Sequence, residues 1–233
     1  MTMLVLGIDT SGPVTSLGLG DGRGPGPGRS VEGGRKHAEV IDQALIDLRA
    51  DFSGGIPQAV CVGVGPGPYS GLRVGIAFAL GLSRAWAVPL VGMCSLDAIA
   101  WASVRDADGE AADRFAGGFV VTTDARRDEL YWARYDRVGV RTAGPQVALR
   151  ADTDFTVPVI SDASVDPALM AHRAACLLES GEQQAPVDDA WGPHGSDGSS
   201  VDVPIGPLLF PRPLYLRAPD ITWSQANTPG AVL

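Results

Sequence analysis

Apolar runs alternate with stretches of helical spacing along the first hundred residues. Residues 4–9 and 59–64 are apolar almost throughout, which is typical of strands buried on both faces of a sheet. Apolar positions recur at three- and four-residue intervals across 36–49, and residues 71–87 also have the pattern of a helix. This alternation of strands and helices predicts an α/β layered fold.

Shorter segments complete the first part of the chain. The elements expected there are strands at 15–20, 29–32 and 90–92, a hairpin loop at 21–28, and a helix at 95–103. Ser95 stands where this helix begins, and serine is favoured as the residue that caps a helix N-terminus. A polar stretch at 105–114 then predicts a boundary between an N-terminal lobe over 1–104 and a C-terminal lobe over 115–233.

The opening pattern of the chain returns in its second half. Residues 119–124 are predicted as a strand that ends in aspartate, and a shift of 115 residues superposes Asp9 on Asp124 and Asp21 on Asp136. The match is faint, yet it indicates a duplicated strand–turn–strand unit and therefore two related lobes. The remaining elements expected are strands at 129–136 and 157–160, a helix at 167–178, a mobile loop at 180–207 and an extended tail at 211–217.

The charge balance limits which molecules the chain binds directly. Its formal net charge is −9, and Lys36 is the one lysine among 18 basic residues. Because lysine and arginine supply most of the non-specific affinity for phosphates, we expect weak direct binding to nucleic acid, with any RNA held by a partner. Hydrophobic residues make up 45% of the chain, which is ample for a buried core.

Cysteine usage and the N-terminal pattern favour a cytoplasmic protein. Cys61, Cys94 and Cys176 are widely spaced and fit neither a disulfide framework nor a zinc site. No apolar run approaches the roughly 20 residues needed to cross a bilayer. Residues 1–9 lack the basic start of a signal peptide and are better described as a first strand.

Asp9, Thr10 and Ser11 follow the first predicted strand. A carboxylate and hydroxyls at the C-terminal edge of a sheet lie where α/β proteins bind ligands, and an aspartate there can hold a metal-bound water beside a nucleotide phosphate. The simpler interpretation is that these side chains stabilise the turn by bonding to the backbone. We treat the three residues as candidates for a nucleotide site.

A glycine-rich segment at 63–73 lies between a predicted strand and a predicted helix. Backbone N–H groups at the start of a helix attract anions, which makes Gly65 and Gly67 candidate nucleotide contacts. However, the segment lacks the Gly-Lys-Ser/Thr of a P-loop, and Pro66 and Pro68 remove donors that a phosphate would need. It therefore fits either an anion site or a rigid turn that allows close packing.

The helix after this segment carries a stripe of small residues, Gly71, Gly75 and Ala79, at every fourth position. Glycine inside a helix costs about 1 kcal/mol relative to alanine, so these glycines need a packing reason. The stripe can face the chain's own sheet or a helix of a partner, and the sequence does not choose between them. The second interpretation predicts a partner interface formed by His37, Ile41, Leu45, Leu48, Gly71, Leu72, Gly75, Ile76, Ala79 and Leu80.

The sequence predicts neither catalytic residues nor metal ligands. Two histidines four residues apart on a helix can hold a metal ion, but the position four after His37 is Ile41. No serine, cysteine or threonine stands in a nucleophile setting such as Gly-x-Ser-x-Gly. We expect no intrinsic cofactor, and the binding of ATP with magnesium stays open.

Several segments, taken in order, resemble the TsaB/YeaZ family. They are Gly-Ile-Asp-Thr-Ser at 7–11, Lys-His-Ala-Glu at 36–39, Gly-Val-Gly-Pro-Gly-Pro-Tyr-Ser-Gly-Leu-Arg-Val-Gly at 63–75, Thr-Asp-Ala-Arg-Arg-Asp-Glu-Leu-Tyr-Trp-Ala at 123–133 and Pro-Leu-Tyr-Leu-Arg at 213–217. These segments span nearly the whole chain, and the central one is highly specific. Tyr69 stands where phenylalanine is usual, and the stretch at 180–207 matches no motif.

The resemblance implies an actin-like ATPase fold of the sugar kinase and Hsp70 type, with two ribonuclease-H-like lobes of which the second is reduced. It also implies kinship to TsaD, the catalytic subunit, whose metal is held by a His-x-x-x-His helix. Here Ile41 stands at the second ligand position, so the metal chemistry is expected to be lost. The same Ile41 argues against the proteolysis that older glycoprotease-like names suggest.

Family members of this kind act as scaffolds that pair with TsaD and are joined by a small ATPase, TsaE. The complex transfers threonylcarbamoyl to the adenosine next to the anticodon of tRNAs that read codons beginning with A. A homodimer is expected when TsaD is absent. Two alternatives remain from the residues themselves: a small actin-fold ATPase or small-molecule kinase, supported by Asp9 and the glycine-rich segment, and a degenerate glycoprotease-like metallopeptidase.

Overall fold

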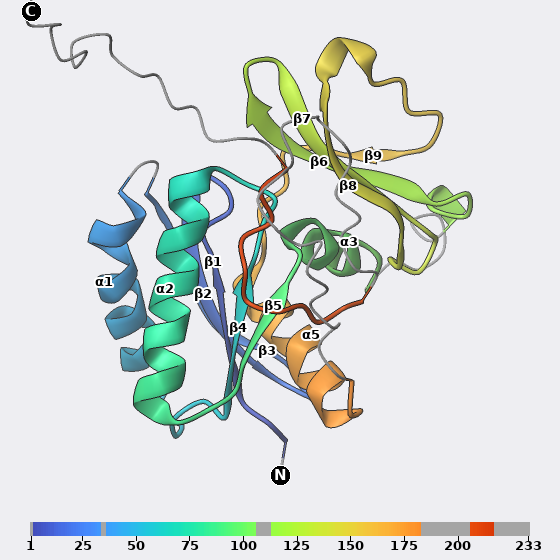
Figure 1. The fold of residues 1–233 in the computed structure, drawn as a ribbon. Helices are drawn as coiled ribbons and strands as arrows, with labels where there is room; N and C mark the ends of the chain where they lie inside the picture. The colour runs from blue at the N-terminus through green and yellow to red at the C-terminus, as the bar shows by residue number, and fades with distance from the viewer. Residues whose placement is uncertain (1, 34–35, 106–112, 183–205, 217–233) are drawn as a thin grey trace, which may run out of the picture.

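The computed structural model describes residues 2–33, 36–105, 113–182 and 206–216, which form two β-sheets and the helices around them (Figure 1). The first sheet contains, in spatial order, β3 (Gly24–Glu32), β2 (Val14–Asp21), β1 (Val5–Asp9), β4 (Ala59–Gly63) and β5 (Leu90–Met93). The second sheet contains β8 (Arg141–Leu149), β7 (Glu129–Tyr135), β6 (Phe119–Arg126) and β9 (Val159–Ile160).

The two sheets repeat the same pattern of strand pairing. In the first sheet, β1 is antiparallel to β2 and parallel to β4. In the second sheet, β6 is antiparallel to β7 and parallel to β9. This order and direction confirm the α/β fold with two related lobes that the faint repeat at an offset of 115 predicted.

Helices cover both faces of the first sheet. α1 (His37–Ala50) and α2 (Tyr69–Trp86) lie on one face, and α5 (Pro167–Glu179) lies on the other (Figure 1). α3 (Ser95–Arg105) packs against α5, β6 and β7, so it stands between the first sheet and the second. A short 3-10 helix, η1 (Arg150–Asp152), follows β8. No helix among the described residues is long and apolar enough to cross a membrane.

The later part of the chain returns to the first sheet. The sequence predicts a C-terminal lobe over 115–233, but α5 of that range packs on β1, β2 and β3 of the first sheet. Glycines explain this contact: a Cβ added at Gly7, Gly18 or Gly20 would collide with the backbone of α5, so their absence of side chains lets the helix lie directly on the strands.

A second returning segment, residues 206–216, extends the first sheet at its β5 edge. Gly92 and Leu209 exchange backbone hydrogen bonds of 2.6 and 2.8 Å, and the Leu214 amide donates to the Val64 carbonyl over 2.8 Å. These bonds cover an edge strand that would otherwise expose unpaired backbone groups. Most of the predicted loop at 180–207, namely residues 183–205, lies outside the described residues, as does residue 217 of the predicted tail.

Two strands differ from the sequence-based expectation. β3 begins at Gly24, inside the Gly/Pro stretch that we predicted as a loop, and β8 was not predicted at all. Both are edge strands that contain proline, which a sheet tolerates at its edges because those positions need not donate to a neighbour. Gly/Pro content is thus a poor signal against an edge strand.

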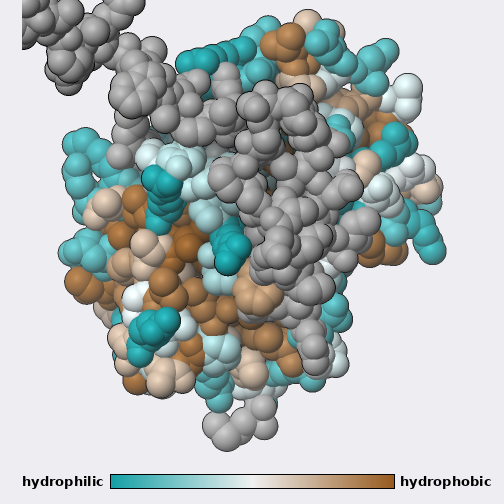
Figure 2. Space-filling view, in the orientation of Figure 1, coloured by the Kyte–Doolittle hydropathy of each residue, from teal (hydrophilic) through white to brown (hydrophobic). Residues whose placement is uncertain are grey.

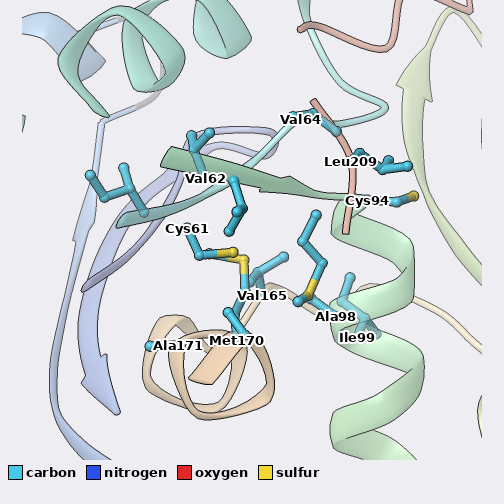
Figure 3. Packing of buried hydrophobic residues seen from close by; sticks show 14 of the residues in the cluster. Cys61, Val62, Val64, Cys94, Ala98, Ile99, Val165, Met170, Ala171 and Leu209 are labelled. Carbon is cyan, nitrogen blue, oxygen red and sulfur yellow. The ribbon is translucent and has the colours of Figure 1, made fainter. Parts of the chain in front are cut away.

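Side chains from β4, α3 and α5 meet in a hydrophobic core, part of which is shown in Figure 3. Cys61 and Cys94 are fully buried there, and neither is disulfide-bonded. Burial raises the pKa of the Cys94 thiol to about 12 and raises that of Cys61 as well, so both remain neutral packing residues.

Candidate functional site

The Asp9 carboxylate ends β1 and is bonded at both oxygens by groups of the same chain. Oδ1 accepts from the Ser11 amide at 2.9 Å and from the Ser11 hydroxyl at 2.8 Å. Oδ2 accepts from the Ser95 hydroxyl at 2.7 Å. Only 3% of Asp9 is exposed, so the side chain stabilises the turn in the way that the simpler interpretation predicted.

Ser95 links Asp9 to the glycine-rich segment. Its hydroxyl also accepts from the Gly65 amide at 3.3 Å, and its own amide donates to the Gly65 carbonyl over 2.8 Å. The sequence predicts that Ser95 caps a helix, whereas in the structure its hydroxyl joins the end of β1 to the loop after β4. Sequence reasoning missed this role because a serine at the first position of a helix looks the same in either case.

The candidate nucleotide residues are brought together, and glycines make this possible. A Cβ at Gly63 would overlap Asp9 Oδ2, and a Cβ at Gly67 would overlap the Ser11 carbonyl. Gly65 has φ +98°, a conformation that favours glycine. The loop therefore packs tightly on the residues that follow β1, as expected for a rigid turn that allows close approach.

Burial dominates the electrostatics of this cluster. Desolvation raises the pKa of Asp9 above its ordinary value, while the hydrogen bonds from Ser95 and Ser11 and the nearby His37 oppose the rise. Burial lowers the pKa of His37, which favours the neutral imidazole.

The His37 side chain also contacts other residues of the same chain. Its Nδ1 lies 2.8 Å from the Thr15 hydroxyl oxygen, and its ring lies against Gly71, where an added Cβ would come within 3.3 Å of Nε2. Ile41, at the position where a second metal-binding histidine would stand, is buried in the core. Across the described ranges, no group of three or more His, Cys, Asp or Glu residues is arranged to hold a metal ion.

The small-residue stripe of α2 faces the chain's own interior. The Thr10 hydroxyl donates to the Gly71 carbonyl over 2.8 Å, and a Cβ at Gly75 would overlap that hydroxyl. Ala79 is likewise fully buried. The first of our two interpretations of the stripe, packing of the helix on its own sheet, is therefore what the structure has.

This placement leaves only part of the predicted partner interface accessible to another protein. Seven of its residues are buried within the chain: His37, Ile41, Leu48, Gly71, Leu72, Gly75 and Ala79. Leu45 and Ile76 are partly exposed, and Leu80 is 45% exposed. The buried seven cannot touch a partner, so any docking on these helices must use other apolar side chains.

Such side chains are present. We use the name α1–α2 surface for seven apolar residues of α1 and α2 that are partly or fully exposed: Val40, Leu45, Ile46, Val74, Ile76, Phe78 and Leu80. Figure 2 shows that hydrophobic residues gather over these two helices.

Comparison with known proteins places the chain in a family. The model described as TsaD: tRNA N6-adenosine threonylcarbamoyltransferase matches residues 32–158, more than half of the chain. An uncharacterized protein of Mycobacterium tuberculosis is 35% identical over 229 residues, which cover 93% of this chain and 92% of that protein. The tRNA threonylcarbamoyladenosine biosynthesis protein TsaB of Escherichia coli is 30% identical over 105 residues, or 44% of this chain and 42% of that protein. The chain belongs to the TsaB/YeaZ family.

Two solved structures share the fold. One is described as an uncharacterized protein with similarity to peptidase YEAZ from Pseudomonas aeruginosa, with a TM-score of 0.62 and 22% identity over 80% of this chain and 98% of that one. YeaZ from P. aeruginosa has a TM-score of 0.60 and 20% identity over 77% and 94%. The fold of this TsaB/YeaZ-family chain is thus the actin-like type that the resemblance implied.

Two motifs of the TsaB/YeaZ family, at 63–75 and 213–217, meet in space. The rings of Tyr69 and Tyr215 stack with their centroids 4.2 Å apart. Arg73 Nε donates to the Tyr215 hydroxyl over 2.9 Å, and another nitrogen of Arg73 donates to the Tyr69 hydroxyl. The Tyr69 hydroxyl, which a phenylalanine at this position would lack, gives Arg73 a second acceptor. The returning segment is thereby fastened to the start of α2.

Proposed function

We propose that this chain is a non-catalytic scaffold subunit in the formation of N6-threonylcarbamoyladenosine next to the anticodon of tRNAs that read codons beginning with A. It would pair with a TsaD-type transferase, be joined by TsaE, and work in the cytoplasm. Family membership carries this proposal: two relatives named for tRNA threonylcarbamoyladenosine biosynthesis match 44% and 46% of the chain, and the TsaD model matches residues 32–158.

The geometry around Asp9 supports a structural rather than a catalytic role. Both Asp9 oxygens accept hydrogen bonds from Ser11 or Ser95, and the residue is 3% exposed, so little of the carboxylate is open to a nucleotide or substrate. His37 is similarly engaged with Thr15 and lies beside a buried Ile41. The residues that correspond to a metal-bearing helix and a phosphate loop in related catalytic proteins thus hold this chain's own fold together.

The α1–α2 surface is the face that we propose for pairing with the transferase. Exposed apolar side chains lose contact with water when a partner covers them, and this supplies the drive for association. The same surface could pair with a second copy of the chain about a two-fold axis when the transferase is absent. Direct contact with tRNA is proposed to be minor, because the net charge of −9 opposes the phosphate backbone.

Reconstitution with TsaD and TsaE of the same organism tests the proposal, with threonylcarbamoyl-adenylate and substrate tRNA as reactants. We expect modified adenosine with the complete set and none with this chain alone. Leu80→Glu should lower both co-sedimentation with TsaD and the rate of modification by at least about tenfold, since it places a charge on the α1–α2 surface. Leu149→Glu is the matched control, because Leu149 is 48% exposed at the end of β8.

Circular dichroism would establish that both variants are folded. Modification by this chain without TsaD would contradict the scaffold role. Normal pairing by a folded Leu80→Glu variant would instead contradict only the assignment of the docking face.

A further inference from the structure

A hollow of about 350 Å³ lies on the side of the molecule formed by α3 and the second sheet. Its apolar wall includes Trp101 of α3, Phe115 before β6, and Val138 in the turn between β7 and β8. Two guanidinium groups, those of Arg105 and Arg137, and one carboxylate, that of Asp113, line the same space. It contains none of the residues around Asp9 and none of the α1–α2 surface.

The walls of the hollow are held in place by packing and hydrogen bonds. The Asp136 carboxylate accepts from the amides of Val138 at 3.0 Å and Val140 at 2.8 Å, which fixes the turn that carries Arg137. Gly139 has φ +81° and lies so close to Val104 that an added Cβ would come within 3.0 Å of it. The turn therefore sits rigidly against α3, and a ligand would not have to order it on binding.

Positive charge gathers here although the chain as a whole is acidic. Besides the two lining arginines, Arg173 lies 5.4 Å from the Trp101 ring and Arg114 lies 5.5 Å from the Phe115 ring. Burial lowers the pKa of Arg173, which means that its charge has lost part of its hydration. Three guanidinium groups, those of Arg105, Arg114 and Arg173, thus lie 5.4 to 5.8 Å from the two rings, and Arg137 lines the same hollow. This arrangement attracts an anion.

We propose that this hollow binds a small planar aromatic anion of mononucleotide size. The volume falls at the lower end of the range of about 300 to 1,000 Å³ in which proteins hold small ligands. The aromatic ring of the ligand would lie against the partly exposed Trp101 side chain, as rings pack on aromatic and apolar surfaces. Its anionic group would face Arg137, since a guanidinium group binds a phosphate or carboxylate with paired hydrogen bonds.

Isothermal titration of the full chain with AMP at low salt tests the site. Arg137→Glu should weaken AMP binding by at least about tenfold, because a charge-assisted hydrogen bond is replaced by repulsion. Arg84→Glu on α2 makes the same change in net charge on an exposed residue away from the hollow and should leave binding unchanged. Adenosine and inorganic phosphate should each bind more weakly than AMP, since each satisfies one half of the site.

Other outcomes would overturn the proposal. Absence of AMP binding at millimolar concentration would do so, as would equal loss of binding in the two charge-reversal variants. Phosphate that binds as tightly as AMP would leave the aromatic wall without a role. Should Arg137→Glu fail to fold, Arg137→Gln removes the charge with a smaller change and carries the same expectation of weaker binding. Failure of the site would not bear on the scaffold role, which is tested without AMP.

Discussion

The Asp9 carboxylate is a charged group placed where the folded chain offers it little water. Three hydrogen bonds from Ser11 and Ser95 favour the ionised form, and burial favours the neutral one. Burial is the larger effect, so the folded-state pKa lies above the ordinary value of 3.8 that applies in the unfolded chain. At a pH between these two values the folded chain holds the proton more tightly than the unfolded chain does, and folding is linked to protonation.

We therefore predict that Asp9 makes the chain less stable as pH rises. The stabilisation from its protonation is fully present below 3.8 and is lost as pH increases through the folded-state pKa. The free energy of unfolding of the natural chain minus that of Asp9→Asn should fall across this window and then level off. The fall should be about 1.4 kcal/mol for every pH unit that separates the folded-state pKa from the unfolded-state pKa. Urea denaturation of both proteins from about pH 4 to about pH 7 measures this difference.

The subtraction removes the titration of shared groups that do not interact with Asp9. His37 is not one of them, because the Asp9 charge opposes the fall in the His37 pKa and Asp9→Asn removes that effect. A difference that rises with pH would mean that the hydrogen bonds from Ser11 and Ser95 outweigh burial. At this scale the sequence was informative about Asp9 and Ser11, because a polar pair after an apolar strand marks a turn. The sequence could not identify Ser95 as a partner of Asp9 or Thr15 as a partner of His37. Both contacts join residues that lie far apart in the sequence and meet only in the folded chain.

α2 shows how far a pattern of residues within one helix can be interpreted. The spacing of Gly71, Gly75 and Ala79 correctly indicated that another group approaches the helix closely. Spacing alone did not say whether that group belongs to the same chain, and in the structure it is Thr10 of the turn after β1. The neighbouring Gly81 is exposed, with nothing within 4 Å of an added Cβ.

Gly75 and Gly81 therefore make a matched pair for mutation. We predict that Gly75→Ala destabilises the chain by about 1 to 3 kcal/mol, because the new methyl group overlaps the Thr10 hydroxyl and the helix must shift. Gly81→Ala should instead stabilise it by up to about 1 kcal/mol, since it improves helix propensity and meets no neighbour. Urea denaturation gives both values, and equal effects of the two substitutions would contradict the packing of α2 on Thr10.

At the scale of the whole molecule, two segments from the later part of the chain pack back on the first sheet. α5 and residues 206–216 follow the second sheet in sequence and pack on the first sheet in space. The duplication at an offset of 115 was visible because it repeats the order of residues along the chain. The packing of α5 on the first sheet was not visible in the sequence. It depends on Gly7, Gly18 and Gly20, which form one smooth area across two strands.

A buried ionic cluster also connects the two halves. Asp97 of α3 accepts from the Tyr135 hydroxyl at 2.8 Å and from Arg141 Nε at 3.0 Å, so it ties α3 to β7 and β8. Arg141 further donates to the Gly144 carbonyl over 2.8 Å. The Arg141 side chain is 3% exposed and that of Asp97 is 16% exposed. Removing one partner from such a pair leaves the other charge buried without its counter-charge.

We predict that Arg141→Met destabilises the chain by about 3 to 5 kcal/mol, the usual cost of leaving one charge of a buried pair uncompensated. Adding Asp97→Asn should recover part of this loss, because asparagine is neutral and its oxygen can still accept from Tyr135. Arg150→Met is the control: its pair with Asp128 spans 3.7 Å between side chains that are 55% and 75% exposed, so it should cost at most about 1 kcal/mol. Urea denaturation compares the three proteins with the natural chain. If the double variant were no more stable than Arg141→Met, the loss would come from packing and from the Gly144 carbonyl, and the charge of Asp97 would not be what holds α3 to the second sheet.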